Sequence, residues 1–421
     1  MVMEAKSHRR SLRALDWLNV FMSDVQTGIG PYLAIYLMAT RHWDPAHIGL
    51  AMSAMGIASV VAQTPAGALT DRLRQKRWMI VAAAVVVAIG CLWIVTSPAL
   101  AGVIAAQALI GSTATIFPTA VAAITLGLVG PSQLAARMGR NGACNHAGTV
   151  GGAILAGLIG YYIAQEGIFY LVIAMSGGTI LAVLLIREED IDHDLARGAR
   201  TQDGAAHIAG LGQLVADRRI AIFALAAVLF HFANAAMLPL VGELLSTGHD
   251  QGSSLYMSAC IIVAQIVMIP VATWAGRVAG ARGRKPVLLL GFLVLPVRGV
   301  LYTLSGNPYF LVSVQILDGM GAGIFGVLSV LVVADLTRGT GRFNLTNGAI
   351  STAIGIGAAL SNVISGMLVQ YTGYRGAFLT LAGIAALAAL WLGLVMPETQ
   401  GNSTTVQENV PEGIYPGVVQ S

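Results

Sequence analysis

Charged side chains are scarce in this chain: Asp, Glu, Lys and Arg make up only 10% of its 421 residues, whereas 56% are hydrophobic. Soluble domains carry roughly 25% charged residues. A soluble chain of this length cannot hide so much apolar surface while it keeps so few charges outside. The composition therefore excludes an ordinary soluble protein, and lipid must be the solvent for much of the chain.

Cysteine and the common catalytic motifs are also lacking. The three cysteines, Cys91, Cys144 and Cys260, are widely spaced in apolar stretches, which favours buried small side chains over a disulfide framework or a soft-metal site. The chain has no Gly-x-x-x-x-Gly-Lys-Ser/Thr loop, no His-Glu-x-x-His and no Gly-x-Ser-x-Gly. We therefore expect no metal, no cofactor, no ATP-driven pumping and no enzyme activity. The net charge of +4 is no argument for a nucleic-acid partner.

Stretches of about 20 or more largely uncharged residues recur along the chain, and each is long enough to cross ~30 Å of hydrocarbon as a helix. They predict an all-α membrane protein with twelve transmembrane helices, at roughly 14–38, 47–70, 78–97, 99–129, 142–165, 167–186, 220–245, 252–276, 286–305, 308–336, 347–370 and 374–396. Polar stretches divide the chain into a first six-helix bundle (1–186), a connector (187–219), a second six-helix bundle (220–396) and a polar tail (397–421).

The distribution of Lys and Arg predicts the orientation. With the N-terminus in the cytoplasm, 21 of the 24 basic residues fall in inner segments and only Arg41 and Arg375 in outer loops. Such a bias is typical of cytoplasmic loops. We expect both termini and the connector in the cytoplasm, in a bacterial inner membrane, and no removable signal peptide.

The two bundles repeat each other in sequence. Four pairs of residues match at shifts of 208 or 209: Pro31 and Pro239, Gln107 and Gln315, Gly67 and Gly276, and Lys76 and Lys285. Six helices followed by six similar helices form two parallel halves. Transporters use this arrangement because a site between two halves faces either side of the membrane when the halves rock.

A short basic loop carries a family resemblance. GALTDRLRQKR (67–77) resembles the loop between helices two and three of the major facilitator superfamily, in which Gly-x-Leu-x-Asp-Arg precedes a Gly-Arg-Lys cluster. The second copy, GRVAGARGRK (276–285), keeps the cluster but has Gly280 where the acid belongs. The resemblance covers essentially the whole chain and implies the fold of that family, with two pseudo-symmetric six-helix halves.

The resemblance also implies gating residues, because in that family these loops latch the cytoplasmic side while the protein faces outward. Their counterparts here are Gly67, Asp71, Arg72, Lys76, Gly276, Arg284 and Lys285. Gly67 would let two helices approach closely, and Asp71 would pair with an arginine or a helix N-terminus. A charged cap at the membrane surface remains the alternative.

Two departures from the family pattern concern proton antiport. Gln107 stands where proton-linked members often carry an arginine, and Ile110 where they carry a glutamine. The helix-five sequence AGTVGGA (147–153) only resembles the antiporter signature, since it lacks the proline. Antiport is therefore not established by motif.

Charged groups at membrane depth are costly, so each is a candidate functional residue. Arg298 and Asp318 lie at similar depth on adjacent antiparallel helices, which predicts a structural ion pair. Asp24 has no basic partner at its depth, and burial favours the protonated form of a carboxyl group. Asp24 is therefore the first candidate for proton coupling, followed by Asp318 and by His231, a histidine that a hydrogen bond alone would also explain.

Polar residues on the helices that line the central cavity in this family are candidates for substrate binding. They are Gln26, Tyr32, Gln107, Thr113, Asn234 and Gln315. Mostly neutral groups suggest a small uncharged or weakly charged solute rather than a phosphorylated sugar or a dicarboxylate, which would need clustered Arg and Lys.

We expect a secondary transporter that functions as a monomer and exports a small organic or drug-like compound in exchange for protons, with the proton gradient as energy source. Import of a nutrient with protons by the same fold is one alternative. A membrane receptor or assembly component that moves no solute is the other.

Overall fold

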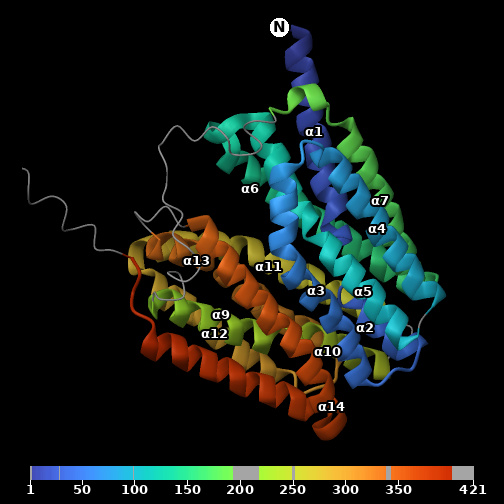
Figure 1. The fold of residues 1–421 in the computed structure, drawn as a ribbon. Helices are drawn as coiled ribbons and strands as arrows, with labels where there is room; N and C mark the ends of the chain where they lie inside the picture. Colours follow the sequence, from blue (N-terminus) through green and yellow to red (C-terminus); the bar gives the residue numbers. More distant parts are fainter. Residues whose placement is uncertain are drawn as a thin grey trace, which may run out of the picture.

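The computed structural model describes residues 2–27, 29–97, 99–192, 218–248, 252–337 and 343–400. These residues form helices and no strand (Figure 1). Lipid explains this, because a helix satisfies its backbone polar groups within one segment. The elements are α1 (Val2–Val25), α2 (Tyr32–Ile35), the π-helix η1 (Tyr36–Thr40), α3 (Pro45–Arg72), α4 (Lys76–Thr96), α5 (Leu100–Ala114), α6 (Ile116–Tyr162), α7 (Gly167–Leu185), the 3-10 helix η2 (Glu188–Asp190), α9 (Arg218–Ala235), α10 (Met237–Gly248), α11 (Ser253–Arg282), α12 (Arg284–Leu301), α13 (Pro308–Leu336) and α14 (Phe343–Val395).

Two glycines divide the longest helices. Gly130 in α6 has φ 71° and ψ 173°, and Gly373 in α14 has φ 70° and ψ 174°, a conformation that glycine adopts without strain. Each helix therefore supplies two membrane segments, and the described residues contain the twelve segments that the sequence predicts. Eight stretches of helix among them are long and apolar enough to cross a membrane by length and composition.

The hydrophobic cores show how the halves meet. We call the end of the bundle with the loops at 73–75, 187 and 283 the connector end, and the end with residues 41–44 and 302–307 the far end. One core joins the first half to far-end residues of the second, such as Met237, Leu311 and Phe378. The other core contains second-half residues alone, such as Phe223 and Phe292. The halves therefore share a core at the far end and diverge toward the connector end (Figure 1).

The most extensive contacts between the halves are those of α3 with α14 and of α6 with α11. Small residues let the first pair approach closely: a Cβ on Gly49 would lie 2.2 Å from the Asn362 carbonyl oxygen. At the far end of this pair, Gln370 Nε2 donates to Asp44 Oδ1 at 2.6 Å. The far end is thus closed by direct contact between the halves.

The first membrane segment is not the continuous helix that the run 14–38 predicts. Its chain leaves the helical path between α1 and α2, where Gly30 has φ 52° and Pro31 follows. Proline has no N–H for the helical ladder, which favours a break at this point. The seventh segment is interrupted at a single residue, Ala236, between α9 and α10, and Pro239 lies in the first turn of α10. The Ser361 hydroxyl accepts the Ala236 N–H at 3.1 Å.

The fifth predicted segment also differs from the structure. Residues 131–162 belong to one helical segment after Gly130, so the helix begins about a dozen residues before the predicted start at 142. The connector begins against the first half, because the Ser11 hydroxyl donates to Asp190 Oδ2 at 2.6 Å. The rest of the connector, 193–217, and the tail from 401 lie outside the described residues.

Candidate functional site

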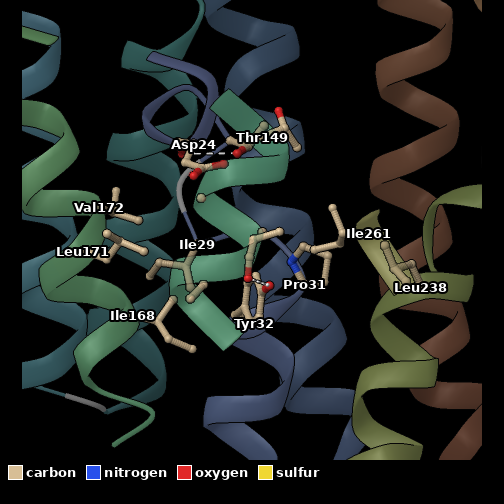
Figure 2. A pocket seen from close by; sticks show the side chains of 15 residues that line it. Asp24, Ile29, Pro31, Tyr32, Thr149, Ile168, Leu171, Val172, Leu238 and Ile261 are labelled. Carbon is tan, nitrogen blue, oxygen red and sulfur yellow. Dashed lines mark hydrogen bonds between the residues drawn. The ribbon is translucent and has the colours of Figure 1, made fainter. Parts of the chain in front are cut away.

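A cavity of about 220 Å³ lies where the first membrane segment is interrupted (Figure 2). Asp24 and Thr149 lie at one end of the cavity. Among the described residues that line it, Asp24 alone carries a charged group. The walls are apolar side chains from both halves: Ile29, Pro31, Ile168, Leu171, Val172, Leu238 and Ile261. A single acid therefore stands in a hydrophobic chamber.

The Asp24 carboxylate rests against the backbone of α6. A Cβ added at Gly152 would fall 1.5 Å from Asp24 Oδ2, so only glycine leaves the space that this acid occupies. No described residue donates a hydrogen bond to the carboxylate or pairs with it. The Thr27 hydroxyl donates instead to the Asp24 main-chain oxygen, at 3.2 Å. The acid thus depends on the cavity itself for solvation.

Tyr32 closes the cavity toward the far end and joins the halves. Its hydroxyl lies 2.8 Å from the Ser258 hydroxyl on α11 and 3.3 Å from the Ala153 carbonyl oxygen on α6. Farther toward the connector end, His146 Nδ1 lies 3.0 Å from Gln265 Oε1, again between α6 and α11. Polar contacts therefore cross between the halves on both levels beside the chamber.

A second polar cluster lies inside the second half. Arg298 is 1% exposed, and its Nη1 lies 2.5 Å from Asp318 Oδ1 and 2.5 Å from Asn234 Oδ1. Arg298 Nε donates to the Tyr302 hydroxyl at 2.9 Å, and Gln315 Nε2 donates to the same hydroxyl at 2.8 Å. The ion pair that the sequence predicts is present in the structure, within a network that joins α9, α12 and α13.

The other predicted cavity residues do not line the chamber. Gln107 is buried on α5, and the Thr113 hydroxyl donates to the Leu109 carbonyl oxygen of its own helix at 2.8 Å. The His231 Nδ1 lies 3.1 Å from the Ala227 oxygen, and its ring packs edge-on against Phe325. Gln26 is half-buried in the interrupted stretch. The structure therefore brings Asp24 and Tyr32 together in the chamber and leaves these four outside it.

The first loop motif has a buried lysine at its centre. Lys76 is 2% exposed, and its Nζ donates to the carbonyl oxygens of Thr70 and Leu73, both at 3.1 Å. A cation at these carbonyls stabilises the C-terminal end of α3. The close helix approach that we expect at Gly67 is absent, because a Cβ there would meet no described atom within 4 Å. The halves have diverged at this level. The side chains of Asp71 and Arg72 lie outside the described part of the chain.

The second loop motif uses arginine for the same purpose. Arg284 Nη1 donates to the Ala279 carbonyl oxygen at the end of α11 (2.7 Å), and its Nε pairs with Asp335 Oδ2 on α13 (3.0 Å). Lys285 contributes its backbone N–H, which donates to Glu398 Oε2 at 3.1 Å. At Gly276 an added Cβ would have ordinary contact with Val327, at 3.5 Å. Gating roles for these loop residues stay predictions.

Sequence reasoning missed three groups. Glu243 on α10 is 2% exposed in the membrane region, and its position near the end of an apolar run concealed it. Asp16 pairs with two arginines of α6: Arg137 Nη2 lies 2.7 Å from Asp16 Oδ1 and Arg140 Nη2 lies 2.7 Å from Asp16 Oδ2. These pairs join α1 to α6. Glu398 follows the last helix, where no periodic pattern reveals a role. Of the three, Glu243 alone could have been found from the sequence, because it is the single acid in an apolar stretch.

Comparison with known proteins agrees with this architecture. The family model described as Major Facilitator Superfamily matches residues 17–282 and 268–416. The chain belongs to the major facilitator superfamily. It is therefore a multi-pass membrane protein of a family of transporters, which are not enzymes.

Relatives within the superfamily differ widely in similarity. An uncharacterised MFS-type transporter of Mycobacterium tuberculosis (strain CDC 1551 / Oshkosh) is 48% identical over 401 residues, which cover 94% of this chain and 96% of that protein. Multidrug resistance protein 2 of Bacillus subtilis (strain 168) is 26% identical over 167 residues, 39% of this chain and 40% of that protein.

Solved structures share the superfamily fold. A variant of the nucleoside transporter NupG has a TM-score of 0.76 at 16% identity and covers 91% of this chain and 99% of its own. The xylose transporter XylE from E. coli, in an inward open conformation, has a TM-score of 0.70 at 11% identity, with coverages of 93% and 97%. At these identities the likeness concerns the fold alone.

Proposed function

We propose that this transporter exports a small organic compound in exchange for protons, as a monomer in the bacterial inner membrane. In this proposal the termini and the connector end face the cytoplasm. The 21-to-2 distribution of Lys and Arg supports the orientation. The described state, closed at the far end and divergent at the connector end, is then the one that loads from the cytoplasm.

The observation that carries the proposal is the unpartnered Asp24 carboxylate in its apolar chamber. An ionised carboxylate there is poorly solvated whenever the chamber closes, so closure favours the protonated acid. Opening to water on either side favours release of the proton. On the cytoplasmic side the solute takes the place of the proton. On the outer side the solute leaves and a proton binds again, so each cycle exports one solute.

The chamber also supports a substrate type. Its walls are aliphatic side chains from both halves, with the Tyr32 ring at one end and the Asp24 carboxylate as the single charged group. Such a site suits a compound with an apolar body and one basic or hydrogen-bonding group. The sequence alone favours neutral amide partners, but Gln107 and Thr113 do not reach this chamber. The name of one relative, multidrug resistance protein 2, agrees with the proposed export of a drug-like compound.

Asp24→Asn tests the proposal, because it mimics the protonated acid permanently. We expect loss of uphill transport under an imposed pH gradient, with binding of the solute in detergent retained. Asp24→Glu is the matched control, since it keeps the carboxyl and should keep part of the coupling. The substrate comes from growth of an overexpressing strain on a panel of toxic compounds. Gradient-driven flux at the wild-type rate in Asp24→Asn would remove this residue from the mechanism.

Vesicles of known orientation separate export from import of the same solute. A receptor or assembly component would show no solute flux with any compound that the growth panel identifies. Reporter fusions at Asp44 and Asp250 should indicate the periplasm, and a fusion at Asp203 the cytoplasm. A cytoplasmic signal at Asp44 would reverse the orientation and with it the direction assigned to the described state.

A further inference from the structure

α10 is a wall that two separate hollows share. Its Leu238 lines the Asp24 chamber, while its Leu244 lines a far-end hollow of about 230 Å³ together with Tyr302, Tyr374 and Arg375. α10 also packs on α2 and η1 of the first half. Displacement of α10 would therefore change the chamber and the far-end closure together.

One face of α10 fits the first half closely. A Cβ added at Gly242 would lie 3.2 Å from Ile35 Cγ1 on α2 and 2.6 Å from Met257 Cε on α11. Ile35 is 0% exposed in this closed arrangement. The next residue, Glu243, lies on the side of α10 that contacts α14. An acid thus stands directly behind the surface that closes the far end.

Glu243 is poorly equipped to carry a charge. It is 2% exposed, and its carboxyl group receives one hydrogen bond, from the Tyr374 hydroxyl at 3.3 Å. The Ser246 hydroxyl donates to the Glu243 main-chain oxygen and not to its side chain. By contrast, the Asp16 carboxylate forms ion pairs with two arginines. A buried carboxylate without a cation or several donors is costly, so the closed state accommodates the neutral acid.

No other titratable group satisfies Glu243. The remaining titratable side chains on the elements packed against α10, near its level, are Tyr32, Tyr36, Tyr256, Cys260, His231, Tyr371 and Arg375. Within the described residues none of them makes a hydrogen bond or ion pair with the Glu243 carboxyl group. Tyr374 alone connects it to the far-end hollow, directly after the turn at Gly373.

We propose that Glu243 is a second proton-binding group, which keeps α10 packed on the first half while it is protonated. Loss of its proton through the Tyr374 hydroxyl and the hollow to the far-end solution leaves a carboxylate that needs water. α10 then separates from its neighbours and the far end opens. The inference rests on the proposed function only in that this opening is a step of the transport cycle.

A cysteine at the closed surface tests it. Cys91, Cys144 and Cys260 are replaced by serine and Ile35→Cys is added, in proteoliposomes with an impermeant maleimide on the far-end side. Because maleimides react with the thiolate, the labelling rate is expressed at each pH relative to that of the same cysteine in the denatured protein. We expect this relative labelling rate to rise with pH, by up to about tenfold per pH unit on the acid side of the midpoint, as for one titrating group. Adding Glu243→Gln should leave the rate low at every pH.

Tyr374→Phe keeps the ring but removes the one hydrogen-bond donor, so the midpoint of the labelling curve should move to higher pH. Ser246→Ala on the same helix is the matched control and should keep the original curve. A pH-independent rate with Glu243 intact, or a pH-dependent rate in Glu243→Gln, would overturn the proposal. If Glu243→Gln does not fold, an unmoved midpoint in Tyr374→Phe overturns it equally.

The labelling does not depend on any solute, so the two proposals fail separately. Proton-driven transport together with labelling that ignores pH removes Glu243 and keeps the transporter mechanism. Labelling that follows Glu243 without any proton-driven flux removes the mechanism and keeps the pH-dependent closure.

Discussion

Asp24 and Asn234 each lie one residue before the end of a helix, α1 in the first half and α9 in the second. Their surroundings differ. Asp24 meets an apolar chamber and the backbone of Gly152, whereas Asn234 accepts a hydrogen bond from Arg298, which also holds Asp318. The end of one helix therefore carries an acid without a described hydrogen-bond donor, and the end of the other contributes to a salt-bridged cluster.

This difference separates two uses of a buried charge. The paired cluster holds three helices of the second half together, because Arg298 and its partners lie on α9, α12 and α13. In the proposed function, the lone acid instead makes the conformation of the first half depend on whether a proton or a solute is present. The comparison can be tested from either side.

Neutralising one partner of the ion pair should have the largest effect. Arg298→Gln or Asp318→Asn leaves a buried charge unpaired, at a cost of about 3–5 kcal/mol in unfolding free energy. The double variant should recover most of this loss. Thermal unfolding in detergent measures it, with Arg375→Gln, an exposed far-end arginine, as the charge-removal control. Normal stability in both single variants would show that the pair does not hold the second half together.

Gly152→Ala should damage the first half in a different way. The new Cβ would fall 1.5 Å from Asp24 Oδ2, so the carboxylate must leave its place, with strain of about 1–3 kcal/mol. We expect weaker solute binding and slower gradient-driven flux with little loss of folded protein. Gly151→Ala is the neighbouring control, because no described atom lies within 4 Å of its new Cβ. Equal flux in the two variants would show that the position of Asp24 against Gly152 does not affect transport.

The smallest expected effect concerns Glu398, at the connector end of the second half. Burial alone would raise its pKa, but the N–H groups of Gln400, Arg284, Lys285 and Thr399 stabilise the charged form and hold the pKa below its usual value of 4.5. Its contribution is therefore present above about pH 4.5 and lost as the pH falls through the lowered pKa.

Glu398→Gln should cost about 0.5–1 kcal/mol at pH 7, since this side chain caps the start of α12 and is largely exposed. The cost should vanish at acid pH, where wild type and variant unfold alike. Glu189→Gln, another exposed acid at the connector end, provides the control. A loss in Glu398→Gln that persists unchanged at low pH would exclude the cap as its cause.

Several features of the fold could be predicted because they depend on one-dimensional patterns. The twelve segments follow from hydrophobic length, and the Arg298–Asp318 pair follows from equal depth on adjacent antiparallel helices. The length of the apolar run does not predict the interruption at Gly30 and Pro31, because membrane helices tolerate glycine and proline when neighbouring groups satisfy the backbone. The same uncertainty concealed the early start of the segment after Gly130.

The site was harder to predict, because it depends on which way each side chain turns. Gln107 and Thr113 lie on a helix that the sequence predicts to line the cavity, yet Gln107 is buried on α5 and Thr113 bonds its own backbone. None of the described residues that line the chamber belongs to α5. Asp24 was recognised by its missing partner, which is a property of the sequence. The contact with Gly152 and the position of Glu243 behind α10 required the packed structure.

The interruption between α1 and α2 has an evolutionary consequence. Where a segment leaves the helical path at membrane depth, the main-chain groups without a local partner, unlike the N–H groups of Gly30 and Tyr32, are available to whatever occupies the neighbouring chamber. Every amino acid supplies the C=O group and every one except proline the N–H, so most side-chain exchanges leave these atoms in place. In the proposed function, recognition built partly on such atoms would persist while Ile29, Ile168 or Leu238 change, so that new compounds would be accepted without loss of these contacts.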